Sequence, residues 1–186
     1  MLETTRRGAL LGLASAGATL YAAPAHATLV RGLSLTELAQ KSERIGVLEP
    51  LEASCRYVGI GGRKSLVTDT RVLVHEAWTG AAESELLLRT LGGRLDGVGE
   101  LVHGQPTLQL GTRAVGFLKL SRDRQVWWMT GMAQGHFPLS DASQIARLLA
   151  SPNLPDIVQP EASAVRRLVG LRLGEARELV RRARQP

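Results

Sequence analysis

The sequence predicts a mainly β protein with peripheral helices (α+β), centred on a small OB-like antiparallel barrel, with a β-sandwich as the alternative. Three observations favour this fold class. A long alternating segment begins at Leu66, shorter segments of strand-like composition follow it between turn signals, and helical spacing occurs only near the two ends of the chain. The long second strand and the break before the last strands favour the barrel over the sandwich.

Residues 1–27 predict an export signal that is removed. Arg6-Arg7 resembles the twin-arginine motif of proteins that are exported already folded, an apolar Gly- and Ala-rich run follows, and Ala25-His26-Ala27 supplies a cleavage site before Thr28. An uncleaved membrane anchor is the alternative, but so short and Gly-rich a run spans a bilayer poorly. We therefore expect a periplasmic or secreted protein with no transmembrane segment after cleavage.

The first elements follow from local signals. Ser34-Leu35-Thr36-Glu37 has the spacing of a capping box and predicts a short helix over 35–42. Residues 46–59 have strand-like composition, but Pro50 interrupts them, which indicates an edge position, a bulge or two strands. Gly61 to Lys64 then form a turn.

The clearest strand signal runs from Leu66 to Thr79-Gly80. Its predicted inner face and its wet outer face alternate with a period of two. The inner face is Leu66, Thr68, Thr70, Val72, Val74 and Trp78, and the outer face is Asp69, Arg71 and His75. Residues 85–91 are expected to form the next strand.

A Gly-rich segment, 92–111, separates these strands from the last ones and predicts either a long ordered loop or short kinked strands. Strands are expected at 113–120 and 125–132, joined by the turn 121–124, with a short final strand at 135–139. Together with the first helix they give a barrel domain over 28–139.

The C-terminal part, 140–186, is expected to be a helical, Arg-rich extension. A helix from Ser140 or Asp141 to Ala150, a linker at 151–155 and helical spacing over 161–184 are predicted. Residues 161–186 carry seven arginines and three glutamates, which contribute +4 of the net charge of +6, and the signal contributes +1. Residues 28–160 therefore carry only +1, which argues against a nucleic-acid partner. The arginines could contact an anionic surface, flank an apolar stripe, or form a solvated face.

Four segments resemble a loosely defined, uncharacterised family of exported bacterial proteins in which a short helix precedes a β-barrel. They are Arg31 to Leu38, Val72 to Gly80, Leu91-Gly92-Gly93 and Gly131 to Phe137. The resemblance covers roughly 31–139 and carries no catalytic residues. Relatives often have a more basic or longer Gly-rich segment, whereas 95–100 is acidic here.

Patterns typical of catalysis or cofactor binding are not found. His75, His103 and His136 are far apart in the sequence, without the spacing of a zinc site. The single cysteine, Cys55, predicts a small buried side chain on a strand, and a reactive thiol is the alternative. The glycines of 92–111 lack the helix that follows a phosphate-binding loop. We expect no catalytic residues, metal or cofactor, although a hydrolase with a dispersed active site stays open.

Trp127-Trp128 is the strongest candidate for a binding surface. Alternation places Trp127 with Met129 on one face and Trp128 on the other, so one tryptophan is expected in the core and the other exposed or under a helix. Arg94 and His103 join them as tentative binding residues in the loop 92–112. We therefore predict a noncatalytic exported binding or accessory protein that contacts another exported protein or an envelope component. An inhibitor or chaperone-like partner of an exported enzyme, such as a metalloprotease, is the first alternative.

Overall fold

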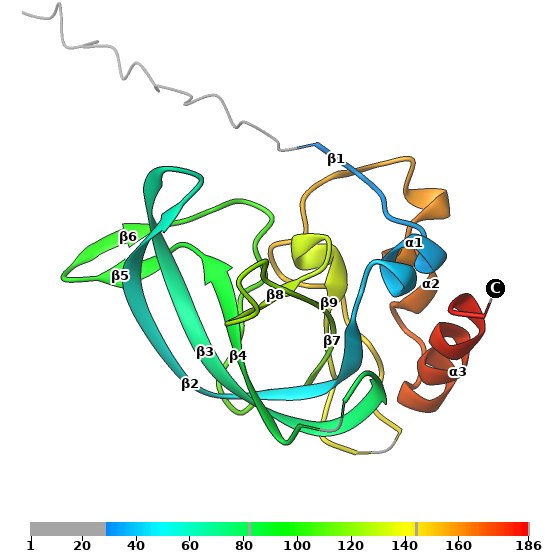
Figure 1. Cartoon of the computed structure of the whole chain (residues 1–186). Helices are drawn as coiled ribbons and strands as arrows, with labels where there is room; N and C mark the ends of the chain where they lie inside the picture. Colours follow the sequence, from blue (N-terminus) through cyan, green and yellow to red (C-terminus); the bar gives the residue numbers. More distant parts are fainter. Residues whose placement is uncertain (1–28, 82, 144, 186) are drawn as a thin grey trace, which may run out of the picture.

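A computed structural model describes residues 29–81, 83–143 and 145–185. The predicted export signal lies outside these residues. The chain is mainly β with a few helices, as predicted (Figure 1). None of the helices in the described ranges combines the length and apolar character that crossing a membrane requires.

Five strands pair side by side into a ring. They are β2 (Arg44–Ile60), β3 (Arg63–Thr79), β4 (Glu85–Leu91), β7 (Ala114–Leu120) and β8 (Trp127–Met129). The order is β2-β3-β4-β8-β7, and the additional β2–β7 pairing closes the barrel. The β4–β8 pair is parallel, which corrects the antiparallel expectation. A closed ring of five strands cannot alternate direction at every neighbour, so at least one pair must be parallel.

The remaining elements decorate this ring. Strand β9 (His136–Pro138) extends the sheet beside β7, β5 (Gly93–Leu95) pairs with β6 (Val98–Glu100), and β1 (Val30–Arg31) pairs with β10 (Ile157–Val158). The helices are α1 (Leu35–Gln40), α2 (Ala164–Leu168) and α3 (Leu173–Ala183), and single 3-10 turns η1 (Met132–Gly135) and η2 (Pro160–Ala162) lie between elements. The Gly-rich segment therefore contains both predicted features, a short hairpin and an ordered loop.

Strand β2 bends at three register shifts, between Ile45 and Gly46, between Val47 and Leu48, and between Pro50 and Glu52. Of the three possibilities raised by Pro50, the bulge is the one observed. The bends let the first part of β2 pair with β7 while the whole strand pairs with β3. Gly46 is required at this crossing, because a Cβ there would lie 2.2 Å from the Glu76 carbonyl oxygen.

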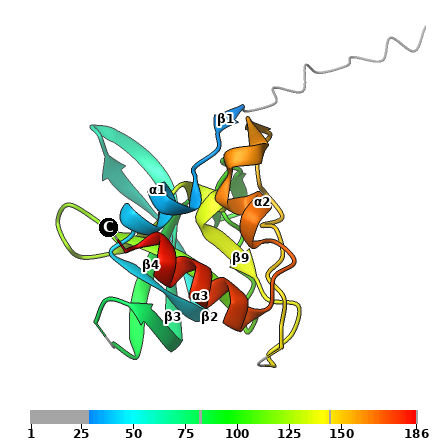
Figure 2. The ribbon, with the colours of Figure 1, turned by 90° about the vertical axis from the view of Figure 1, so that its right-hand side faces the viewer.

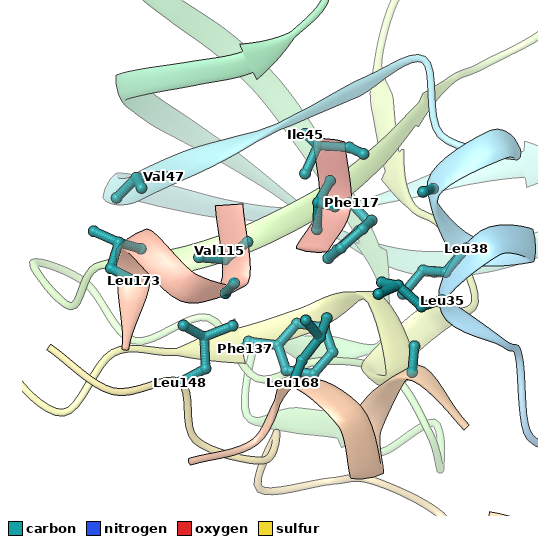
Figure 3. Packing of buried hydrophobic residues seen from close by; sticks show 14 of the residues in the cluster. Leu35, Leu38, Ile45, Val47, Val115, Phe117, Phe137, Leu148, Leu168 and Leu173 are labelled. Atoms are coloured by element: carbon teal, nitrogen blue, oxygen red, sulfur yellow. The ribbon is translucent and has the colours of Figure 1, made fainter. Parts of the chain in front are cut away.

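Two cores share the barrel wall. The interior core consists of Leu48, Val72, Leu86, Leu88, Leu118 and Met129. The outer core fills the space between the wall and the helices, and Figure 3 shows its side chains converging from β2, β7, β9 and the three helices. Phe117 and Phe137 meet edge to face at its centre, with ring centroids 5.8 Å apart.

The N-terminal helix is confirmed with its capping box. Ser34 Oγ accepts a hydrogen bond from the Glu37 amide at 3.1 Å, and the Ser34 amide donates to Glu37 Oε2 at 2.9 Å. The helix ends at Gln40, slightly earlier than predicted. Leu35 and Leu38 point into the outer core.

The helix expected over 140–150 is wrong. Ser140 Oγ accepts from the Arg147 amide, and Asp141 Oδ1 accepts from the Ser143 amide, so the side chains cap a turn instead. Ala146 and Leu148 are fully buried with an exposed neighbour on each side, which is the period of a strand.

The C-terminal extension packs against the barrel rather than standing apart from it (Figure 2). The helical segment predicted over 161–184 is split into α2 and α3 around Gly170, whose φ is +87°. Leu168, Leu173, Ala176 and Val180 are buried in the outer core, while the arginines lie outside it. An apolar stripe of this segment packs on the barrel, and the arginines beside it form an exposed face.

Candidate functional site

The barrel has two ends, and the predicted binding residues are divided between them. We call the end formed by residues 80–81, 83–84 and 121–126 the loop end, and the end formed by 61–62 and 92–113 the hairpin end. Trp127 begins β8 at the loop end, whereas Arg94 and His103 are exposed at the hairpin end. Trp128 lies opposite Arg89 and Lys119 in the barrel wall. The structure therefore does not unite these four residues in one site.

Trp127 instead contacts Arg44, which was not predicted as a binding residue. Its half-buried ring packs against the interior core and lies below the guanidinium of Arg44, whose Cζ is 4.9 Å from the ring centroid. Arg44 is the first residue of β2 and is only 2% exposed. A cation over the face of an indole is favourable, and more so when both groups are withdrawn from water.

The charge of Arg44 is incompletely compensated. Its Nε and Nη1 atoms are buried and have no hydrogen-bond partner among the described residues. Glu83 Oε2 lies 3.2 Å from Nη1, close enough for an ion pair, but the angle does not fit a hydrogen bond. Leaving buried donors of a charged group unpaired is costly, so such groups point to a site where something else binds.

Arg44 lines an open pocket of about 550 Å³ at the loop end, although its Nε and Nη1 atoms are themselves shielded from solvent. Charged groups and apolar side chains line it together. The lining residues are Glu43, Arg44, Gly80, Ala81, Glu83, Leu86, Leu87, Leu120, Arg124, Gln125 and Trp127. We call this the loop-end pocket, and its size is typical of a ligand site.

Glu43 and Arg124, two other charged residues of the loop-end pocket, differ in their hydrogen bonding and exposure. Glu43 Oε1 accepts a hydrogen bond from the Leu120 amide at 3.0 Å, which anchors this carboxylate to the rim. Arg124 is exposed at the turn, with a φ of +58°. Arg44 is thus the buried cation of the pocket and Arg124 the exposed one.

No protein-family model, curated protein or solved structure matches the chain. The site therefore has to be judged from its own geometry.

The hairpin end carries a smaller pocket of about 330 Å³. Thr68, Thr70 and Thr90 line it from the barrel side, and residues of the Gly-rich segment line it from the other. Cys55 Sγ lies 3.3 Å from Thr68 Oγ1 and packs against Gly93, where a Cβ would approach the sulfur to 2.7 Å. The thiol is half-buried on a strand, in line with the expected packing role.

The three histidines lie in separate surroundings. His75 Nε2 is 2.6 Å from Glu49 Oε2, His136 Nδ1 is 3.0 Å from Ser151 Oγ, and His103 is exposed. Burial lowers the pKa of His136 to about 4. In the described ranges, no three His, Cys, Asp or Glu side chains converge as a metal site would require.

The outer face of β3 is less exposed to solvent than predicted, because Asp69 is only 5% exposed. Arg89 donates two hydrogen bonds to its carboxylate, at 2.5 and 2.7 Å, and Arg56 donates a third at 2.9 Å. Burial opposes ionisation of Asp69, but these bonds outweigh it and hold its pKa below the usual value. A fully paired buried charge of this kind stabilises the barrel wall and differs from Arg44.

Proposed function

We propose that this chain is a noncatalytic exported binding protein that holds a partner polypeptide at the loop end of its barrel. The observation that carries the proposal is the buried guanidinium of Arg44, whose Nε and Nη1 lack hydrogen bonds although Arg44 lines an open pocket. A site used only for stability gains nothing from such a group, because an apolar side chain would close the barrel end at lower cost. The export signal and the family resemblance support a partner outside the cytoplasm.

The partner is expected to contact both loops of this end. Gly80, Ala81 and Glu83 of one loop and Arg124 and Gln125 of the other line the loop-end pocket. The exposed Leu87 adds an apolar contact beside them. Arginine and tryptophan are the residues most often found at the energetic centre of a protein interface. A neutral main body with this local chemistry favours a protein over a nucleic acid.

Site-specific photo-crosslinking tests the proposal. A photoreactive amino acid replaces Arg122 at the loop end or Arg63 at the hairpin end, both of which are exposed. In the producing cell we expect a discrete crosslink to an exported protein from position 122 and none from position 63. Equal crosslinks from both positions, or crosslinks from 63 alone, would contradict the loop-end interface. The identity of the captured protein also decides whether the chain is an inhibitor or chaperone-like partner of an enzyme.

A hydrolase with a dispersed active site is the second candidate, and one contact favours it. The His75–Glu49 pair, 2.6 Å apart, lies beside a pocket of about 360 Å³ that Ser143 also lines. A carboxylate that orients a histidine next to a hydroxyl is the arrangement of nucleophilic catalysis. Labelling by a fluorophosphonate that is lost in Ser143→Ala would support it, and absence of labelling in the natural protein would count against it.

A further inference from the structure

We propose that the loop-end pocket binds the side-chain carboxylate of a glutamate or aspartate on the partner, and that Glu83 occupies the site when the partner is absent. This inference rests on the proposed function and adds the chemical group that is recognised. It also assigns Glu83 the role of an internal competitor.

The geometry around Arg44 favours a planar anion. The indole of Trp127 occupies one side of the guanidinium, with Cζ 4.9 Å from the ring centroid, so an incoming ligand must approach from the pocket. The N–H groups of a guanidinium lie in one plane. A carboxylate matches this planar arrangement and forms strong charge-assisted hydrogen bonds with it. The Nε and Nη1 atoms have no hydrogen-bond partner but are shielded from solvent, so displacement of Glu83 must uncover them before they donate these bonds.

The charge balance of the pocket favours a single negative charge. Glu43 and Glu83 both line the loop-end pocket, against Arg44 and Arg124. Because the lining charges balance, a phosphate group, which carries close to two charges at neutral pH, gains little net attraction from the pocket and costs more to desolvate than a carboxylate. A carboxylate that replaces Glu83 on Arg44 leaves the local charge balance of the guanidinium unchanged.

Glu83 shows that a glutamate side chain can reach Arg44 from an exposed loop. It belongs to the connection between β3 and β4, and its side chain is 58% exposed, whereas that of Arg44 is 2% exposed. Its carboxylate approaches Nη1 without forming a hydrogen bond, so it is held mainly by charge and is screened by water. A partner side chain that aligns with the N–H groups would therefore displace it.

Side-chain NMR of the full-length, ¹⁵N-labelled protein tests this inference. The Nε–Hε signal of Arg44, assigned by its loss in Arg44→Lys or through its own side-chain correlations, is followed during titration with N-acetyl-glutamate amide. We expect a saturable downfield shift, because Nε gains a hydrogen bond to an anion. N-acetyl-glutamine amide has the same shape without the charge and is expected to leave the signal in place.

The competitor role is tested with Glu83→Gln. This variant is expected to bind N-acetyl-glutamate amide about threefold more tightly, the effect of removing one partly exposed competing charge. Glu161→Gln removes a carboxylate of similar exposure that pairs with Arg166 instead, and should leave the affinity unchanged. The absence of a shift in both the natural protein and Glu83→Gln would overturn the carboxylate site.

Two further ligands identify the source of the carboxylate. N-acetyl-leucine presents a main-chain carboxylate, and inorganic phosphate presents a dianion. Tighter binding of either one than of N-acetyl-glutamate amide would overturn the assignment to an acidic side chain. If no ligand shifts Arg44 but the crosslink from position 122 persists, the inference fails and the proposed function stands. If Arg44 shows a saturable shift but the crosslinks from 122 and 63 are identical, the carboxylate site stands and the proposed loop-end interface fails.

Discussion

The guanidinium of Arg44 lies over the indole of Trp127, with Cζ 4.9 Å from the ring centroid. The contact joins β2 to β8 across the end of the barrel, although these strands are not neighbours in the ring. Trp127 packs against the interior core at this end of the barrel. Arg44 places a charge beside it, at a buried position where an apolar side chain would extend the core. Stability and binding are therefore expected to respond in opposite directions to substitution at Arg44.

Replacing Arg44 with Met should leave the free energy of unfolding unchanged or raise it by about 1–2 kcal/mol, because an incompletely paired buried charge becomes an apolar contact with Trp127. The same variant should lose the crosslink from position 122. Urea denaturation measures the stability. Arg89→Met is the matched control, because it breaks the fully paired contact with buried Asp69 and should cost about 3 kcal/mol. A large loss of stability in Arg44→Met would show that this arginine is structural.

Asp69 should stabilise the protein in a pH-dependent way. Its pKa is lower in the folded state than in the unfolded chain, so its contribution is present above the unfolded value of about 3.9 and is lost as the pH falls further. The difference in unfolding free energy between the natural protein and Asp69→Asn should be large at pH 7 and shrink below pH 4. Asp156→Asn provides an exposed control next to β10. A difference that does not change with pH would contradict the ion-pair explanation.

His136 should make the protein less stable in mild acid. Its pKa is about 4 when folded, against an ordinary value of 6.5, because burial disfavours the charged ring. The unfolded chain therefore binds a proton that the folded chain does not, and stability falls as the pH decreases from about 6.5 to about 4. The full effect amounts to about 3 kcal/mol. His136→Gln should flatten this part of the pH profile, whereas the exposed His103→Gln should not.

The sequence predicted where most of the barrel strands lie along the chain, because most of them carry a local signal. Alternation marks β3, composition marks β4 and β7, and the capping box marks α1. The parallel β4–β8 pair and the strand-like run around Ala146 were missed, because both depend on contacts between distant segments. Ser140 and Asp141 have the local chemistry of a helix cap, and the burial of Ala146 and Leu148 overrides it.

The binding site was predictable only in part. Trp127 could be selected because aromatic pairs on a strand are conspicuous and alternation assigns their faces. Arg44 carried no signal, since it follows Glu43 in a short charged run that is typical of a solvated segment. Only the bend of β2 and the closure with β7 bury it. An arginine at the first position of a strand rich in apolar residues is the one clue that could have identified it.

Gly46→Ala should destabilise the barrel by about 2–3 kcal/mol, because the added Cβ would lie 2.2 Å from the Glu76 carbonyl oxygen and force β2 and β3 apart. Gly59→Ala is the matched control on the same strand. Its added Cβ meets no described atom within 4 Å, so it should be neutral or slightly stabilising. Thermal unfolding of both variants measures the difference. Equal losses of stability in the two variants would show that small backbone shifts relieve the contact between the added Cβ at position 46 and the Glu76 carbonyl oxygen.

The C-terminal extension should matter through its apolar stripe and not through its arginines. Leu168 is fully buried in the outer core, so Leu168→Ala should cost about 3 kcal/mol by leaving a cavity beneath α2. Arg167→Gln changes a neighbouring exposed side chain and should alter stability by less than about 0.5 kcal/mol. Deleting 161–186 would expose the outer-core side chains of β2 and β7, and the product should aggregate. A soluble truncated protein with unchanged thermal unfolding would show instead that the extension is dispensable for the barrel.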